Sequence, residues 1–402
     1  MADSESSLKS TRRCFVKSAV ALTGAALAGG ASLARASTPS SGTAPALSKP
    51  EMWRNREPGM AYRRLGRTGF MVSELSMGGS GPINNPEGVG VFREAIEKGV
   101  NYFDCASRYN RGASEEGWGV LFKEPGVREK VFIATKISEY LGTLYGLCQD
   151  IFNGLPGGKQ EALRKQARDL IAEREVTKPG VFFKYWGSHG NEVEGAYLNY
   201  FIRKEYGWQT SWNKTLEKRF YEVVDLSLKR MHLDEIDVLH FPHGIRMPEE
   251  LEDPFHAEWA AKLKKEGKIL SNAFSCHTDA PRVLDRAAEL GHIDVAQCAY
   301  NIANQGSMEP PMQKAAQAGM GFVGMKAAAI VSPISDSVKP VPEWRIQKLN
   351  TMVPGEDSLP VKAYTWVLQN PAVATVLSEI NNAPMLAENL KVVGKRVDLG
   401  LV

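Results

Sequence analysis

The chain has 402 residues, of which 43% are hydrophobic and 24% are charged, and its formal net charge is +3. A chain of this composition can bury a large core, and a single barrel can use most of its length. The first 36 residues hold five Lys or Arg against two Asp or Glu, so they carry the whole surplus charge. The remaining chain is near neutral and has no basic tract, which argues against nucleic acid as a partner.

Residues 1–36 have the three-part order of an export signal. An Arg-Arg pair within residues 11–17 resembles the twin-arginine translocation motif. An apolar stretch follows over residues 18–33, and residues 34–36 (Ala-Arg-Ala) form a small-x-small cleavage site. The stretch is too short and too weakly hydrophobic for a membrane span. We therefore expect export through the twin-arginine machinery to the periplasm or the extracellular space, with no stable membrane span after cleavage.

Two alternatives stay open for this segment: a cytoplasmic tail with a chance Arg pair, and an uncleaved signal that acts as an anchor. Residues 37–60 are expected to be a linker, because residues 37–50 have linker composition and no apolar period. The folded domain is predicted to span residues 61–402.

Beyond residue 60, short apolar runs that are typical of strands alternate with helical patterns. This alternation predicts a parallel sheet, and a closed (β/α)8 TIM barrel is the economical form. Periodicity alone does not separate the barrel from an open doubly wound sheet. The absence of G-x-G-x-x-G at a strand–helix junction counts against the open fold. The expected strands include 131–135, 236–241, 293–297 and 321–325, and the expected helices include 215–231, 360–369 and 384–390.

Residues 138–213 break the alternation. A charged helix is expected over 159–173, and ten aromatic residues crowd between 182 and 212. A structureless loop of this size is improbable in a compact domain, so we predict a subdomain inserted after the third strand, placed over the barrel mouth as a lid. Its rings form either a platform for a flat or sugar-like substrate or a small core of their own. His189 is expected to be a polar surface residue.

The cysteines form no C-x-x-C pair, so neither a zinc nor an iron–sulfur spacing is present, and we predict no metal site. An oxidising compartment would permit disulfides, but the spacing prescribes none. Free, mostly buried thiols are the expectation, with a Cys276–Cys298 pair as the alternative. The five cysteines are Cys14, Cys105, Cys148, Cys276 and Cys298.

An acid, a tyrosine and a lysine follow the ends of two successive strands. Asp104 ends one strand, Tyr109 comes five positions later, and Lys136 ends the next strand. The carboxyl ends of barrel strands converge on one mouth. A neighbouring ammonium lowers the pKa of a tyrosine, and the aspartate would hold that ammonium charged and in place. We predict a general acid/base that faces a carbonyl, with a structural ion pair beside a buried tyrosine as the alternative.

Several segments, weak singly but in the right order, make residues 61–138 and 214–395 resemble the aldo-keto reductase family. The resemblance implies a TIM barrel that uses NAD or NADP to interconvert a carbonyl (aldehyde, ketone or sugar) and an alcohol. A barrel that binds cofactor but serves as a non-catalytic regulatory or partner subunit is the alternative. The segments are 62–79, 99–109 with 114–116, 131–136, 267–269, 274–277, 297–301, 370–373 and 382–390.

Carried over by position, the resemblance makes Asp104, Tyr109 and Lys136 three of the family's four catalytic residues. The fourth is a histidine at the end of the fourth strand, where His240 and His243 are both present. We choose His243 because it directly precedes a glycine, as the family's histidine often does. The resemblance assigns cofactor contacts to Gly78, Gly79, Ser275, Cys276, Gln297, Met325, Lys326, Glu379, Glu388 and Asn389.

Three of these positions depart from the family's pattern. Cys276 replaces an asparagine, and Met325 replaces a stacking aromatic ring. Glu379 stands in the segment where members that prefer the 2′-phosphorylated cofactor carry Lys or Arg. A carboxylate repels phosphate and accepts ribose hydroxyls, so NAD is favoured over NADP. The alternative is that Lys391 or Lys395 binds the phosphate from another direction.

Overall fold

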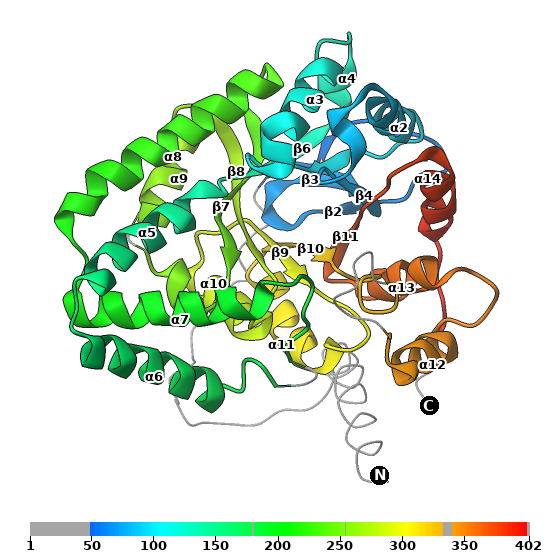
Figure 1. Ribbon diagram of the computed structural model, residues 1–402. Coiled ribbons are helices and arrows are strands. Elements are labelled where there is room, and N and C mark those ends of the chain that lie inside the picture. The colour runs from blue at the N-terminus through cyan, green and yellow to red at the C-terminus, as the bar shows by residue number, and fades with distance from the viewer. Residues whose placement is uncertain (1–48, 179–180, 254, 333–339, 400–402) are drawn as a thin grey trace, which may run out of the picture. The chain divides into compact units, whose positions relative to one another are not determined.

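Eight parallel strands close into a barrel in the computed structural model, which describes residues 49–178, 181–253, 255–332 and 340–399. Their order around the barrel is β10-β11-β4-β5-β6-β7-β8-β9, so the first barrel strand pairs with the last (Figure 1). This confirms the predicted TIM barrel. The strands are β4 (Leu75–Gly78), β5 (Tyr102–Asp104), β6 (Phe132–Lys136), β7 (Ile236–Ile245), β8 (Ile269–Cys276), β9 (Val295–Ala299), β10 (Gly321–Met325) and β11 (Val373–Ser378).

Helices alternate with the strands and surround the barrel (Figure 1). In α8 (Thr210–Met231), Leu216, Phe220 and Val224 lie on the buried face, as the helical period predicts. The other helices of the barrel are α2 (Pro86–Glu97), α3 (Ala113–Leu121), α4 (Val127–Lys130), α9 (Phe255–Lys265), α10 (Ala280–Leu290), α11 (Gln305–Gln317), α12 (Glu343–Met352), α13 (Leu359–Leu368) and α14 (Ala383–Asn389).

A small three-stranded sheet packs its apolar side chains into the barrel core. It consists of β1 (Met52–Trp53), β2 (Tyr62–Arg64) and β3 (Phe70–Ser73), in the order β1-β3-β2. The Phe70 ring stacks on Phe132 of β6 with 4.6 Å between ring centroids. This sheet meets the strands at the amino-terminal end of β6, so the opposite, carboxyl-terminal end of the barrel stays available for a site.

Part of the expected linker 37–60 takes up secondary structure. Met52 and Trp53 pair with Phe70 and Met71 of β3. Arg54 forms a 2.8 Å ion pair with the fully buried carboxylate of Asp237. Burying a carboxylate without a cation would be costly, so this contact fixes the segment on the barrel. Residues 1–48, which include the expected signal and Cys14, lie outside the described residues.

The insertion after the third barrel strand consists of three helices, α5 (Glu139–Asn153), α6 (Gly157–Glu173) and α7 (His189–Tyr206). Helices α6 and α7 lie side by side (Figure 1). Their buried side chains form one cluster with Met247 of the barrel, against which Phe182, Tyr200 and Phe201 pack. The insertion therefore has a core of its own, and only some of its aromatic residues remain for the barrel mouth.

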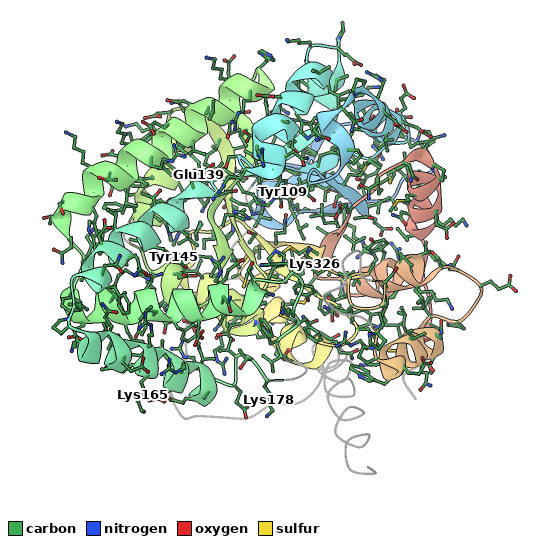
Figure 2. All side chains as sticks on the ribbon, viewed as in Figure 1. Tyr109, Glu139, Tyr145, Lys165, Lys178 and Lys326 are labelled. Atoms are coloured by element: carbon green, nitrogen blue, oxygen red, sulfur yellow. The ribbon has the colours of Figure 1, made fainter. Side chains whose placement is uncertain are left out.

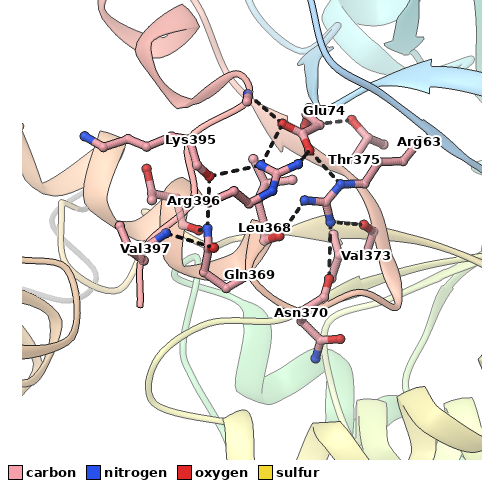
Figure 3. A network of polar contacts seen from close by, with 12 residues as sticks. Arg63, Glu74, Leu368, Gln369, Asn370, Val373, Thr375, Lys395, Arg396 and Val397 are labelled. Carbon is pink, nitrogen blue, oxygen red and sulfur yellow. Dashed lines mark hydrogen bonds and ion pairs between the residues drawn. The ribbon is translucent and has the colours of Figure 1, made fainter. Parts of the chain in front are cut away.

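A polar network joins the amino-terminal hairpin to the carboxyl-terminal segment (Figure 3). The Glu74 carboxylate is fully buried and pairs with Arg63 at 2.7 Å and with Arg396 at 2.5 Å. It also accepts a hydrogen bond of 2.8 Å from the backbone N–H of Gly394. Glu74 and Arg396 are 322 positions apart in the sequence. Their network lies beside the β4–β11 pair, where the barrel closes.

In the ranges that the structure describes, no helix is both long enough and apolar enough to span a membrane.

Candidate active site

Asp104, Lys136 and Tyr109 meet at the carboxyl ends of β5 and β6. The Lys136 ammonium donates to Asp104 Oδ1 at 2.5 Å and to the backbone oxygen of Cys105 at 2.6 Å. Both charged side chains are buried, with 1% of Lys136 and 2% of Asp104 exposed. The ammonium nitrogen lies 4.7 Å from the centroid of the Tyr109 ring. Lys136 thus lies between the other two residues that were predicted from their positions near strand ends, and it contacts both.

Backbone geometry explains how these groups come so close. Asn110 and Arg111 both have positive φ, 50° and 59°, and this turn directs the chain back after Tyr109. Gly79 packs against β5 so closely that a Cβ there would lie 2.4 Å from the backbone oxygen of Asp104. Because Gly79 has no side chain, it can lie directly against the backbone of Asp104. Gly78 lines the cavity described below.

The electrostatics of the group correct one expectation. Burial lowers the pKa of Lys136, but the Asp104 carboxylate more than offsets this, and the pKa ends above its usual value. Burial raises the pKa of Tyr109, and the attraction of Lys136 only partly offsets it. The expected depression of the tyrosine pKa is therefore wrong for this site, because burial outweighs the lysine. Tyr109 keeps its proton at neutral pH.

Of the two candidate histidines, His243 faces the site. It is half-buried and lines the cavity beside Tyr109 and Lys136. His240 is fully buried within β7, where it is in register with Lys136. Burial, followed by the charges of Lys136 and Arg246, holds the pKa of His243 well below its usual range. A neutral imidazole can both donate and accept a hydrogen bond.

A cavity of about 440 Å³ extends from this group toward α14. It brings together all four predicted catalytic residues and eight of the ten predicted cofactor residues, Gly79 and Cys276 being the exceptions. Cys276 is fully buried, and its thiol donates to the backbone oxygen of Thr278 at 2.8 Å. Successive strand residues face opposite sides, so Ser275 lines the cavity and Cys276 does not. The eight are Gly78, Ser275, Gln297, Met325, Lys326, Glu379, Glu388 and Asn389.

The donor and acceptor set of the cavity fits a nicotinamide. The Gln297 side-chain oxygen is buried and has no hydrogen-bond partner among the described residues. Its amide nitrogen lies 3.9 Å from the Met325 sulfur, and Ser275 Oγ accepts from the N–H of Gly244 at 3.1 Å. A buried, unpaired carbonyl oxygen is costly, and the amide of a carboxamide would satisfy it.

A second cavity, of about 360 Å³, adjoins the first. The two share five lining residues: Ser80, Tyr109, His243, His277 and Lys326. The insertion supplies Trp186, His189 and Glu192 to the smaller cavity, and residues 244–246 at the end of β7 supply the facing wall. Figure 2 shows Tyr109 and Lys326 over the strands of the barrel, in the middle of the view. Two of the predicted catalytic residues thus stand where the cavities meet.

His189 is not the surface residue that the sequence predicts. Only 1% of it is exposed, and its ring stacks on Trp186 with 4.0 Å between centroids. Its Nδ1 accepts weakly from the backbone N–H of Tyr185, at 3.4 Å, so its Nε2 carries the proton and donates to Thr278 Oγ1 at 2.7 Å. Three aromatic rings that precede it in the chain pack around it and bury it, which the polar character of histidine does not indicate; they are Phe182, Tyr185 and Trp186.

The lining residues that were not predicted as site residues include Ser80, Arg246 and His277. His277 belongs to a segment that resembles the family, two positions beyond Ser275, so the period of the strand could have identified it. Arg246 follows His243 by three positions, but no pattern in the sequence indicates that it turns toward the mouth.

Within the described part of the chain, no three His, Cys, Asp or Glu side chains are grouped so as to hold a metal. The four described cysteines are buried free thiols.

The chain matches the model of the aldo/keto reductase family over residues 74–330, more than half of its length. It is 36% identical over 132 residues to aldo-keto reductase AFTS1 of Alternaria alternata, covering 30% of this chain and 35% of that protein. It is 25% identical over 209 residues to AMT2 of the same organism, covering 49% of this chain and 45% of that protein. The matched region is less than half the length of each relative.

Among solved structures, aldo-keto reductase AKR11C1 from Bacillus halodurans, in its holo form, superposes with a TM-score of 0.53. The identity is 21%, over 84% of this chain and 92% of that one. A likeness at this level shows the fold, and the family match covers the segments that contain Asp104, Tyr109, Lys136 and both histidines. The chain belongs to the aldo/keto reductase family of oxidoreductases.

Proposed function

We propose that this protein is an exported NAD(P)-dependent oxidoreductase that interconverts a carbonyl compound and an alcohol. The observation that carries the proposal is the position of Tyr109, which keeps its proton, beside a buried Lys136–Asp104 ion pair and between two cavities. In this proposal the larger cavity takes the cofactor and the smaller one the substrate.

Each polar group of the site has a use in carbonyl reduction. A nicotinamide cofactor would supply the hydride. Tyr109 donates its proton to the carbonyl oxygen, and the Lys136 ammonium stabilises the phenolate that remains. Asp104 holds Lys136 charged and in place. Neutral His243 lines both cavities and orients the same oxygen through a hydrogen bond.

We propose NAD as the preferred cofactor. Glu379 and Glu388 line the end of the larger cavity toward α14. Lys391 forms a 2.5 Å ion pair with Glu388, and Lys395 pairs with Asp357. The two lysines that could bind a 2′-phosphate are thus already paired with carboxylates, and the carboxylates of this end favour ribose hydroxyls.

We further propose that residues 1–36 direct the protein through the twin-arginine machinery to the periplasm or the extracellular space. The support is the order of the segment: an Arg-Arg pair, an apolar stretch and a small-x-small site. The twin-arginine resemblance implies transport of folded protein, so the cofactor would travel within the barrel.

The test uses protein exported from cells with its signal intact. The purified protein is denatured, and the supernatant is assayed for NAD and NADP. The native protein is then assayed with a panel of aldehydes, ketones and sugars. We expect about one NAD per chain and reduction of at least one compound. A protein that arrives empty and binds neither nucleotide on titration would contradict the proposal. Bound nucleotide without turnover of any compound would favour a non-catalytic barrel.

A further inference from the structure

The walls of the smaller cavity carry an unbalanced charge. Its charged lining residues are Lys326, Arg246 and Glu192. The three histidines in the wall are neutral, since burial, followed mainly by nearby cations, lowers the pKa of His243 and His277 well below the usual range, and burial lowers that of His189 to about 4. Two cations therefore stand against one carboxylate.

Arg246 and Glu192 satisfy each other. Arg246 Nη2 donates to Glu192 Oε2 at 2.7 Å, and its Nη1 donates to the backbone oxygen of Gly244 at 2.8 Å. The other Glu192 oxygen accepts from Trp186 Nε1 and Ser188 Oγ, each at 2.8 Å. This pair fixes the Trp186 wall and contributes no net charge to the cavity.

Lys326 is the cation that remains. Among the described residues, no carboxylate lies within ion-pair distance of its ammonium group, which stands 5.7 Å from the centroid of the Tyr185 ring. The Asp104 carboxylate is already paired with the Lys136 ammonium. Lys326 is held at φ 60°, a conformation that few residues other than glycine adopt, directly after the end of β10. Burial removes part of the water around the Lys326 ammonium and lowers its pKa, and the charges of Glu379 and Asp104 offset this only in part.

A second polar group beside Lys326 also has no partner. His277 Nδ1 is buried and makes no hydrogen bond within the described ranges. The ring stands edge-on to Trp186, with 5.2 Å between centroids. His277 and Lys326 line both cavities, as do Tyr109 and His243. An unpaired cation and an unpaired imidazole thus lie next to the two groups that would contact the carbonyl.

We infer that the smaller cavity selects substrates that carry a carboxylate, which Lys326 binds while His277 donates a hydrogen bond to it. This inference rests on the proposed function, since it names the substrate class of the same site. A single cation that forms no ion pair matches a monoanion better than a dianion such as a phosphate ester. The aromatic wall formed by Trp186 suits a flat or compact organic group beside the carboxylate.

The first test measures binding without turnover. Benzoate and its neutral analogue benzamide are titrated by calorimetry into protein saturated with NAD. We expect benzoate to bind about ten-fold more tightly, the effect of one charge-assisted contact in a partly buried site. Lys326→Met should bring the two affinities together, and Lys326→Arg should restore most of the difference. Lys314→Met is the control, because Lys314 pairs with Asp285 and Glu289 on the outer helices. Equal affinities in the unmodified protein would overturn the inference.

For a second variant we expect the opposite change in the affinity for benzoate. Glu192→Gln keeps the size of the side chain and an acceptor for Trp186, but it leaves Arg246 without its carboxylate and so adds a second cation to the wall. Benzoate should then bind more tightly than in the unmodified protein, while benzamide is little affected. Weaker benzoate binding would show that the charge of this wall does not control the binding of the carboxylate, against the inference.

Kinetics separate this inference from a role of Lys326 in binding the cofactor pyrophosphate. 4-Carboxybenzaldehyde and its methyl ester are compared by kcat/KM, and the dissociation constant of NAD is measured in parallel. We expect the acid to be preferred about ten-fold, and the preference to vanish in Lys326→Met. A ten-fold loss of NAD affinity with the preference intact would assign Lys326 to the cofactor and overturn the inference. If neither compound nor any other carbonyl is reduced, while benzoate is still preferred, the proposed function fails and the anion site stands.

Discussion

The proton on Tyr109 is the residue-scale feature on which the chemistry depends. Burial keeps its pKa above 10.0 in spite of the nearby ammonium, and its ring lies 4.7 Å from that ammonium. Tyr109→Phe removes the proton donor and keeps the ring. We expect kcat for carbonyl reduction to fall by about 10² to 10⁴, the usual contribution of a general acid. The dissociation constant of NAD should stay within about two-fold. Undiminished turnover in this variant would assign the proton to another residue.

The pH dependence of the two directions follows from the same pKa. Carbonyl reduction needs protonated Tyr109, so its rate should hold through neutral pH and fall only as pH rises through the raised pKa. Alcohol oxidation needs the phenolate, so its rate should increase with pH over the alkaline range. His243 is already neutral and should add no inflection near 6.5. Initial rates of carbonyl reduction and of alcohol oxidation, measured between pH 6 and 10.5, check both expectations. A loss of reduction near pH 7 would contradict the assignment.

The sequence predicted which residues form the site better than it predicted their protonation, burial and orientation. Strand-end positions placed Asp104, Tyr109 and Lys136 together because barrel strands converge at one mouth. The direction of the Tyr109 pKa shift was wrong, since it depends on how far the ring is buried. His189 and Cys276 were misplaced for related reasons. The partners that bury a histidine, and the face toward which a strand residue points, depend on neighbours far away in the chain.

At the scale of elements, the insertion is predicted to be stable as a unit because α6 and α7 share a buried cluster. Val193 is fully buried in this cluster on α7, whereas Val120 on α3 is 53% exposed. Val193→Ala should lower the free energy of unfolding by about 2 kcal/mol through lost packing and a small cavity. Val120→Ala should change it by less than about 0.5 kcal/mol. Urea unfolding of both variants gives the comparison. Equal effects would mean that the cluster does not hold the insertion.

The sequence predicts most of the strands and helices. It predicts less well where their side chains lie in the folded protein. Apolar runs at 236–241 and 321–325 became β7 and β10, and the helical periods became α8, α13 and α14. The aromatic segment was expected either to form a core or to line the mouth, and it does both. Only the folded chain shows that Trp186 goes to the mouth and Tyr197 to the core. The two residues have the same chemical character in the sequence.

At the scale of the whole molecule, the Glu74 network is predicted to stabilise the closure of the barrel. Burial alone would raise the pKa of Glu74, but hydrogen bonds from Arg396 and Gly394 and the charge of Arg63 outweigh it and lower the pKa. Glu74→Gln leaves both arginines without their carboxylate. We expect the free energy of unfolding to fall by roughly 2–3 kcal/mol at pH 7.

The sign of the pH effect provides the control for Glu74→Gln. A depressed pKa in the folded state contributes stability above the ordinary value of 4.5, and this contribution is lost as pH falls through the folded value. The difference between the two proteins should therefore be constant from pH 6 to 8 and shrink below about pH 4.5. A constant difference down to pH 3 would mean that the effect comes from packing rather than charge.

The closure of the barrel also bears on the order of events during synthesis. Leu75 pairs with Val376, and Glu74 binds Arg396, so β4 can pair with β5 early but meets its other neighbour, β11, only after the other barrel strands have been made. Until those partners emerge, β4 has one open edge and the Glu74 carboxylate has no Arg396 to neutralise it. The barrel thus cannot close before residues 373–396 have been made. A transport route that accepts finished folds would therefore have to hold the proposed signal segment, which is made before the barrel, until Arg396 has left the ribosome.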